Sequence, residues 1–193
     1  MKRIEHGQVC DVEIENGLVR KTPRKITATQ LFDRMKGVLT AMQESYFDDV
    51  KTKPAVLETS LNESNGQLIQ SYFGKKSLAE MNRDEILKLP ENQKEALIDL
   101  LLCSEVMRVE IGNFVDLLGY SKGTNPIQGI IRALDPRYSS NIRVSEIGEV
   151  ELIDCDWYYR KERSWLRKLG AYGLTPVIAY FTQKLRRQLI LSL

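Results

Sequence analysis

The residues best suited to chemistry stand at the two ends of a short predicted hairpin. Residues 142–144 and 150–153 have the apolar patterns of two short strands, and Gly148 lies in the turn between them. Asn141 stands directly before the first strand and Asp154 directly after the second. Amide and carboxylate oxygens are hard ligands of the kind that Mg²⁺ takes, and a tight hairpin would bring them to the same end. Because Asn and Asp are also common turn formers, a plain hairpin with polar ends is the competing interpretation.

The chain has too few histidine and cysteine residues for zinc binding or for nucleophilic catalysis by a Ser-His-Asp or Cys-His unit. The chain of 193 residues has one histidine, His6, and three scattered cysteines, Cys10, Cys103 and Cys155, with no CxxC pair. A structural zinc site and a Ser-His-Asp or Cys-His mechanism are therefore excluded. The 42% apolar and 28% charged residues are ordinary for a soluble globular protein. With no apolar leader at the N-terminus and no apolar stretch near ~18 residues, we expect a cytoplasmic protein.

The first part of the chain predicts a small antiparallel sheet with one helix. Asn16-Gly17 lies between two strand-like runs and is the strongest short hairpin signal, because both central residues of a type I′ turn need positive φ. Thr27 and Gln30 form a capping box that opens a helix. The expected elements are strands at 9–15 and 18–22, a helix from about 28 to Phe47, and strands at 55–60 and 67–73 turned at Ser64-Asn65-Gly66.

The rest of the chain predicts mainly helices. Ser77 caps a short helix to Lys88, and Pro90 opens a long helix that Gly112 closes. Two further helices, at about 159–169 and 176–191, are expected to be split by Gly170 and Gly173. The buried side of the long helix is predicted to comprise Ala96, Leu97, Leu100, Leu101, Val106, Met107 and Val109.

The order of these elements resembles the protein-kinase-like fold in a small bacterial version. Residues 140–144 and 148–156 read SNIRV and GEVELIDCD, and are similar to the family's N-I-L-V and G-x-V-x-L-I-D-F-D stretches. In that family the Asn closes the catalytic loop and the first Asp begins the metal-binding turn. Asn141 and Asp154 match these positions. Asp156 makes the segment more similar to that of lipopolysaccharide-core sugar kinases than to the D-F-G of protein kinases.

The resemblance implies an α+β, protein-kinase-like fold and a Mg²⁺–ATP site. Residues 1–76 would form an N-lobe, a small antiparallel sheet with one helix, and residues 77–193 a reduced, mainly helical C-lobe. Asn141 and Asp154 would hold the magnesium ion that accompanies ATP.

Four further residues match positions that, in this family, contact the nucleotide or orient the lysine that contacts it. Lys21 ends a Gly-Leu-Val-Arg-Lys strand that resembles the strand whose lysine contacts the α- and β-phosphates. Glu44 is the only glutamate in residues 26–47 and is the candidate partner of that lysine. The segment around Tyr72 and Phe73 resembles the hinge whose backbone faces the adenine ring. A solvent-facing charge is the ordinary interpretation of Lys21 and Glu44.

Two departures from the family pattern bear on catalysis. No glycine-rich phosphate loop precedes the first hairpin, where only Gly7 stands. Counting back five residues from Asn141 reaches Pro136, which cannot accept a proton. Asp135, one residue further back, is the preferred candidate for the catalytic base. Asp116 is the alternative, but an inserted loop would have to separate it from Asn141.

Two function classes follow. The first is an ATP- and Mg²⁺-dependent phosphotransferase acting on a hydroxyl of a glycan, such as a lipopolysaccharide core sugar, or of a protein. The second is a catalytically inactive kinase-like protein that binds or regulates. A domain unrelated to kinases is the remaining structural interpretation. Nucleic-acid binding is not favoured, because aromatic residues at strand spacing are lacking.

The charge distribution suggests one further partner. Residues 157–193 carry eight Lys and Arg against one acidic residue, a net charge of +7. Lys184, Arg186 and Arg187 flank an apolar stripe in the last helix, and such a face can meet an anionic membrane surface. A solvated basic face on a core helix is the alternative.

Overall fold

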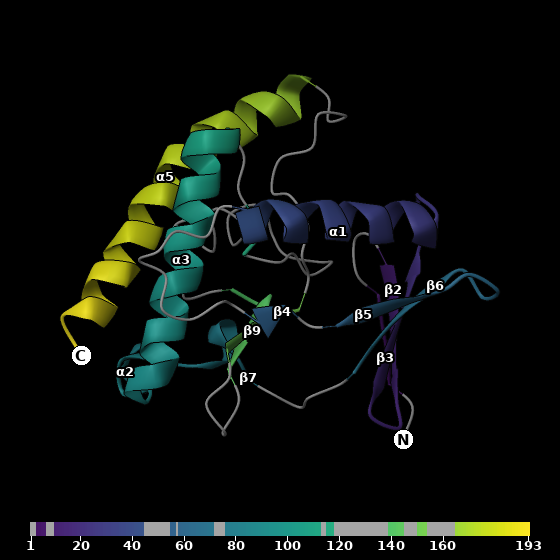
Figure 1. The fold of residues 1–193 in the computed structure, drawn as a ribbon, viewed down its shortest axis with the longest axis horizontal. Coiled ribbons are helices and arrows are strands. Elements are labelled where there is room, and N and C mark those ends of the chain that lie inside the picture. Colours follow the sequence, from purple (N-terminus) through teal and green to yellow (C-terminus); the bar gives the residue numbers. More distant parts are fainter. Residues whose placement is uncertain are drawn as a thin grey trace.

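The protein is a mixed α+β structure in which two sheets and three long helices share one core (Figure 1). The computed structural model describes residues 3–6, 10–44, 55–56, 58–71, 76–112, 115–117, 139–144, 150–153 and 165–193. The α+β class predicted from the sequence is confirmed.

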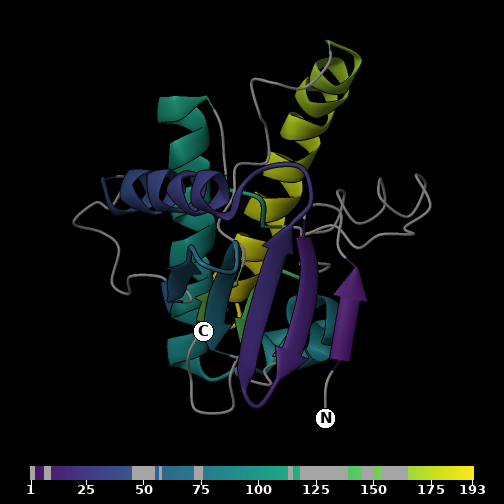
Figure 2. The same ribbon diagram turned by 90° about the vertical axis from the view of Figure 1, so that its right-hand side faces the viewer.

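The larger sheet has five antiparallel strands in the order β1-β2-β3-β6-β5. Figure 2 shows the purple strands β1 to β3 side by side. The strands are β1 (Arg3–His6), β2 (Cys10–Glu15), β3 (Leu18–Pro23), β5 (Thr59–Asn62) and β6 (Gln67–Ser71).

The β2–β3 hairpin forms as the Asn-Gly signal predicts. Asn16 has φ 52° and Gly17 has φ 73°, so both central residues are in the left-handed region that a type I′ turn requires. Strand alternation then separates the two faces of the sheet. On the outer face, Arg20 lies 3.7 Å from carboxylate oxygens of both Glu13 and Glu15. On the inner face, Lys21 stands in register with an apolar neighbour on each side.

Helix α1 (Ala28–Glu44) covers the inner face of this sheet. The predicted capping box is present: the Thr27 hydroxyl accepts from the Gln30 amide, and the Gln30 side chain accepts from the Thr27 amide, both at 3.1 Å. The described helix ends at Glu44, and the predicted extension to Phe47 lies outside the described residues. Its buried residues recur at helical spacing: Ala28, Leu31, Met35, Val38 and Met42.

The smaller sheet gathers short strands from distant parts of the chain, in the order β4-β9-β8-β7. The predicted hairpin of β8 (Ile142–Val144) and β9 (Val150–Leu152) is confirmed. The predicted single strand over residues 55–60 is wrong. Its first part is β4 (Ala55–Val56), which pairs parallel with β9, and only the part from Thr59 pairs with β6. β7 (Lys76–Ser77) completes the smaller sheet.

The predicted single helix between Ser77 and Lys88 is replaced by two shorter elements. A 3₁₀ turn, η1 (Leu78–Glu80), precedes α2 (Arg83–Leu87). The interruption falls at Asn82, whose side chain accepts from the Glu85 amide at 2.9 Å and starts a new helix. Asn competes with helical backbone bonds in this way and therefore favours caps over helix interiors.

Helix α3 (Glu91–Ile111) matches the prediction at both ends. Pro90 stands at its N-cap, and Gly112 ends it with φ 72°. Most of the predicted apolar positions are buried, but Val109 is 73% exposed and Val106 is only partly buried. Val109 was wrongly predicted to be buried: at ~100° per residue it lies about 180° around the helix from the buried Leu100.

Helix α5 (Trp165–Ile190) is one helix in the region where two were predicted from about residue 159. Gly170 and Gly173 lie within it, because a helical glycine costs only about 1 kcal/mol and need not end a helix. Pro176 is also inside. Figure 1 shows α5 beside α3, on the side of the molecule away from the larger sheet. Within the described chain, no helix is long and apolar enough to cross a membrane.

One continuous apolar core joins both sheets and the helices. It contains Leu68 of the larger sheet, Leu152 of the smaller sheet, Val38 of α1 and Leu97 of α3, none of which has any exposed surface. The division into lobes at residues 76 and 77 stays a prediction.

Candidate functional site

The two sheets meet at the backbone carbonyl of Ile153. Lys21 of β3 donates to this oxygen through Nζ at 3.2 Å, and Gln70 of β6 donates through Nε2 at 3.1 Å. Both donors belong to the larger sheet, whereas Ile153 directly follows β9 of the smaller sheet. The two donor side chains are almost fully enclosed, with 9% and 2% of their surface exposed. The larger sheet thus holds the residue that directly precedes Asp154.

Lys21 is a buried cation that forms no ion pair with any residue that the structure describes. An ammonium group has three donor hydrogens. Among the residues that the structure describes, the hydrogen-bond partner of Lys21 Nζ is one neutral carbonyl, that of Ile153. A buried charge without a counter-charge is costly. An anion beside Lys21 would offset this cost, and the phosphates of a nucleotide would supply one.

Asn141, directly before β8 of the smaller sheet, also holds Ile153 in place. Its backbone carbonyl accepts from the Ile153 amide at 2.9 Å, and its side-chain Nδ2 donates to the Asp116 carbonyl at 2.7 Å. Asn141 is 6% exposed. Since Nδ2 is used as a donor, Oδ1 is the atom of this side chain suited to ligating a cation. Asn141 and Asp116 therefore lie together, although 25 residues separate them in the sequence.

Ser139 fastens the segment at residues 115–117 to the segment that contains Asn141. Its hydroxyl donates to the Leu117 carbonyl and accepts from the Ile142 amide at 3.0 Å. Its carbonyl accepts from the Ala79 amide at 2.9 Å. Ser139 has no exposed surface. The main chain on either side of residues 118–138 is consequently held at one place, beside η1.

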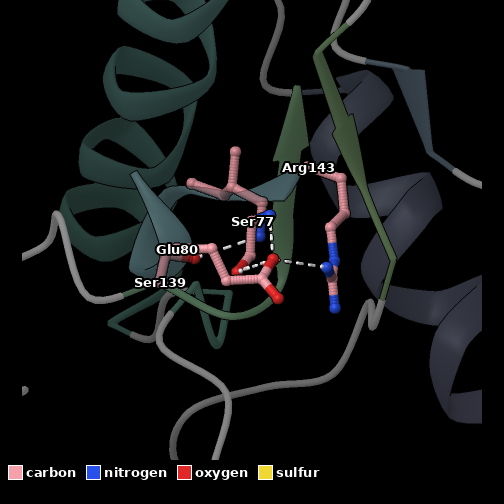
Figure 3. A network of polar contacts seen from close by, with 5 residues as sticks. Ser77, Glu80, Ser139 and Arg143 are labelled. Carbon is pink, nitrogen blue, oxygen red and sulfur yellow. Dashed lines mark hydrogen bonds and ion pairs between the residues drawn. The ribbon is translucent and has the colours of Figure 1, made fainter. Parts of the chain in front are cut away.

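A second polar network supports this region from β7 and η1 (Figure 3). The Glu80 carboxylate accepts from the Ser77 amide at 2.7 Å, the Ser77 hydroxyl at 2.9 Å and the Arg143 guanidinium at 3.0 Å. The backbone hydrogen bond from Ser77 is the main cause that holds the pKa of Glu80 below its usual range. The network ties the strand that follows the predicted hinge to β8, which begins directly after Asn141.

Four predicted site residues lie outside the described residues: Tyr72, Phe73, Asp135 and Asp154. Two of them directly follow described elements, because β6 ends at Ser71 and Ile153 is the last described residue before Asp154. Their predicted roles therefore stay predictions.

Glu44 and Lys21 are not brought together. Glu44 is exposed at the last residue of α1, and the described chain shows no ion pair between it and Lys21. At ~100° per residue, Glu44 lies about 180° around the helix from the buried Met35. The predicted pairing of these two side chains stays a prediction, and the described arrangement of α1 does not supply it.

Sequence reasoning missed Gln70. Besides the Ile153 carbonyl, its Nε2 lies 2.7 Å from the Thr59 hydroxyl oxygen. A signal was available, because alternation along β6 places Gln70 on the same face as the fully buried Leu68. An amide at an inward position of a strand needs internal partners. The carbonyl of Ile153, the residue before Asp154, is one of these internal partners.

The donor set fits magnesium better than a softer metal. The structure offers one amide oxygen, at Asn141, and the sequence places the Asp154 carboxylate one residue beyond Ile153. The described residues contain no group of three or more His, Cys, Asp or Glu side chains that could hold a metal ion. A thiol mechanism also has no support at Cys103, since burial raises its pKa to about 11.

Comparison with known proteins adds no assignment. A scan against protein-family models finds no match. A search of the curated proteins finds no significant match either. The class that the structure itself defines is a mixed α+β protein with an antiparallel N-terminal sheet and a buried Lys–Gln–Asn junction between its two sheets.

Proposed function

We propose that this protein is an ATP- and Mg²⁺-dependent phosphotransferase of protein-kinase-like fold. The observation that carries the proposal is the convergence of Lys21, Gln70 and Asn141 on Ile153, the residue directly before Asp154. Phosphoryl transfer needs positioning and electrostatic stabilisation more than covalent chemistry. A buried cation beside a hairpin that presents oxygen ligands suits that requirement.

Each residue takes one role in this proposal. Lys21 binds the nucleotide phosphates, whose negative charge neutralises its buried ammonium group. Asn141 Oδ1 and the Asp154 carboxylate hold Mg²⁺, which neutralises phosphate charge and orients the transferred group. The backbone near Tyr72 and Phe73 faces the adenine ring. The acceptor is a hydroxyl of a glycan, such as a lipopolysaccharide core sugar, or of a protein, and the reaction takes place in the cytoplasm.

The hydrogen bond from Asn141 to the Asp116 carbonyl favours Asp116 as the base. A base must lie close to the acceptor hydroxyl and the transferred phosphate. Asp116 lies beside a proposed magnesium ligand, because its carbonyl accepts from Asn141 and because Ser139 holds Leu117 next to the segment that contains Asn141. Asp135 remains the second candidate.

The alternative function is a nucleotide-binding protein that does not catalyse transfer. The sequence supports it through the missing glycine-rich loop, since a backbone cradle for phosphates is then absent or short. Binding through Lys21, Asn141 and Asp154 does not require the base.

Formation of ADP from Mg²⁺–ATP, with water as the acceptor, separates these possibilities. For a phosphotransferase we expect slow turnover by the unaltered protein. Asp116→Asn should reduce it by at least about 100-fold and leave nucleotide affinity unchanged, because the base acts on the acceptor. The matched variant is Asp135→Asn.

If Asp135→Asn alone lowers turnover, Asp135 is the base. Nucleotide binding without any turnover would favour the inactive binding protein. Absence of both binding and turnover would contradict the proposed function.

A further inference from the structure

The outward face of α5 has a composition unlike an ordinary solvated helix face. Its buried residues, Ile178, Ala179, Thr182, Leu185 and Leu189, lie on one side. The opposite side forms one exposed sector of about 120°, as the ~100° helical step requires. We call this sector the α5 outer face. In the described part of the helix it contains Pro176, Tyr180, Gln183, Lys184, Arg187 and Ile190, and we include Leu191, which directly follows the helix.

Large apolar side chains are unusually exposed on the α5 outer face. Tyr180 is 61% exposed, Ile190 49% and Leu191 79%. Leu193, just beyond the helix, is 53% exposed. Single exposed apolar residues are common, but several on one helix face indicate an interaction surface.

The charges on the α5 outer face are all positive. Lys184 and Arg187 lie between Tyr180 and Leu191 along the sector, and α5 contains no acidic residue. Arg186, which was predicted to share this face, instead points to Glu105 of α3 at 3.7 Å. The outer face therefore presents two cations within an apolar stripe.

The position of the helix leaves this face open. α5 lies at the edge of the molecule with α3 on its inner side (Figure 1). A second copy of the chain fits the face poorly, because a two-fold contact would bring Lys184 and Arg187 against the same residues of the partner. Anionic lipid headgroups complement the cations, and the apolar side chains can enter the boundary between headgroups and acyl chains.

We infer that the α5 outer face docks on the surface of an anionic lipid bilayer, with the helix lying parallel to that surface. Lys184 and Arg187 bind headgroup phosphates while Tyr180, Ile190 and Leu191 insert between the headgroups. Basic and apolar contributions act together, as they do in interfacial amphipathic helices. This inference does not depend on nucleotide binding.

Flotation of the full chain with lipid vesicles, without nucleotide, tests the inference. The probe is phosphatidylcholine vesicles with about 30 mol% phosphatidylglycerol, compared with phosphatidylcholine alone. We expect binding to the anionic vesicles at about 0.02 M salt and its loss at about 0.5 M, where the Debye length is only a few ångströms. The double variant Lys184→Gln/Arg187→Gln should bind about 30-fold more weakly.

Two matched variants make the test specific. Lys25→Gln/Lys36→Gln removes the same charge from exposed positions outside α5 and should leave vesicle binding unchanged. Tyr180→Ser/Leu191→Ser keeps the charges and should weaken binding several-fold, with thermal unfolding showing that the fold persists. Binding that the two control lysines affect as strongly, or no binding to anionic vesicles, would overturn the inference. A dimer that Leu191→Ser dissociates would also overturn it.

Discussion

The two sheets are built in opposite ways. The larger sheet consists of strands of four to six residues, and its β2–β3 and β5–β6 pairs are hairpins closed by short turns. The smaller sheet uses strands of two or three residues that come from three separate segments, β4, β7 and the β8–β9 hairpin. The proposed site lies in the smaller sheet, at the point where the larger one contacts it. Local sequence therefore builds most of the larger sheet, and the site combines one local hairpin with long-range contacts.

The largest expected effect tests whether the two sheets share one core. Leu152 of the smaller sheet and Leu68 of the larger sheet are both fully buried. Leu152→Ala and Leu68→Ala should each lower the free energy of unfolding by about 3 kcal/mol, measured by urea denaturation. A loss below about 1 kcal/mol for Leu152→Ala alone would show that the smaller sheet is not part of the cooperative core.

The next largest effect is expected at Lys21, where nucleotide affinity should change much more than the free energy of unfolding. Lys21→Met should weaken Mg²⁺–ATP binding about 30-fold, because a hydrogen bond to a charged group contributes about 2 kcal/mol. The free energy of unfolding should change by less than about 1 kcal/mol, since the variant removes a poorly matched buried cation and keeps the apolar stem.

Arg20→Met is the matched control for this measurement. Arg20 is the neighbouring cation on the outer face of the same strand, where it pairs with Glu13 and Glu15. Isothermal titration calorimetry should show its nucleotide affinity unchanged. An equal loss of affinity in both variants would indicate general electrostatic attraction instead of a site at Lys21.

These contrasts also explain what the sequence could predict. The Asn16-Gly17 turn, the Thr27 capping box and the end of α3 at Gly112 depend on the chemistry of a few adjacent residues, and all three were correct. The transfer of Ala55–Val56 to the smaller sheet depends on β9, nearly a hundred residues later, and no local signal carries it.

The site was only partly predictable for the same reason. The hairpin that places Asn141 beside Ile153 is local, and its motif was readable. The contact of Asn141 with Asp116 spans 25 residues, so counting along the chain could not predict it. The choice of Asp135 as the base stays a prediction, because Asp135 lies outside the described residues. The helical phase places Glu44 away from the buried side of α1, a constraint that the choice by elimination did not use, and its pairing with Lys21 stays a prediction.

A smaller effect is expected at Gln70, which joins the two sheets. Gln70→Leu should cost about 1 kcal/mol of stability, because it removes a buried hydrogen bond to Ile153. It should also raise the Mg²⁺ concentration needed for nucleotide binding several-fold, since Asp154 is then less well positioned. Gln67→Leu is the control on the same strand, with a bond to Thr22 on the outer face. Equal Mg²⁺ dependence in both variants would leave Gln70 a purely structural residue.

The smallest expected effect concerns Glu80 in the network of Figure 3. Because its pKa is held low in the folded state, its contribution to stability is present above about pH 4.3, the unfolded value. The contribution is lost as the pH falls through the folded pKa. Glu80→Gln should cost only about 0.5 kcal/mol near neutral pH, because the Glu80 side chain is exposed and solvent screens its charge. The difference from the unaltered protein should vanish in acid.

Glu63→Gln, in an exposed turn, is the matched control for the pH series. Thermal unfolding between pH 3 and pH 7 should show no pH-dependent difference for this variant. A constant difference for Glu80→Gln across that range would mean that the carboxylate charge does not stabilise the network.

The most direct measurement of the central claim is a thermal-shift titration with ATP and Mg²⁺ on the unaltered protein and on Asp154→Ala. A ligand that binds the native state and not the unfolded state raises the free energy of unfolding, by about 2.7 kcal/mol at a ligand concentration a hundredfold above Kd. The melting temperature of the unaltered protein should rise only when both ATP and Mg²⁺ are present, and that of Asp154→Ala should not rise. No shift at saturating Mg²⁺–ATP, or an equal shift in Asp154→Ala, would contradict a nucleotide–magnesium site at the junction of the two sheets.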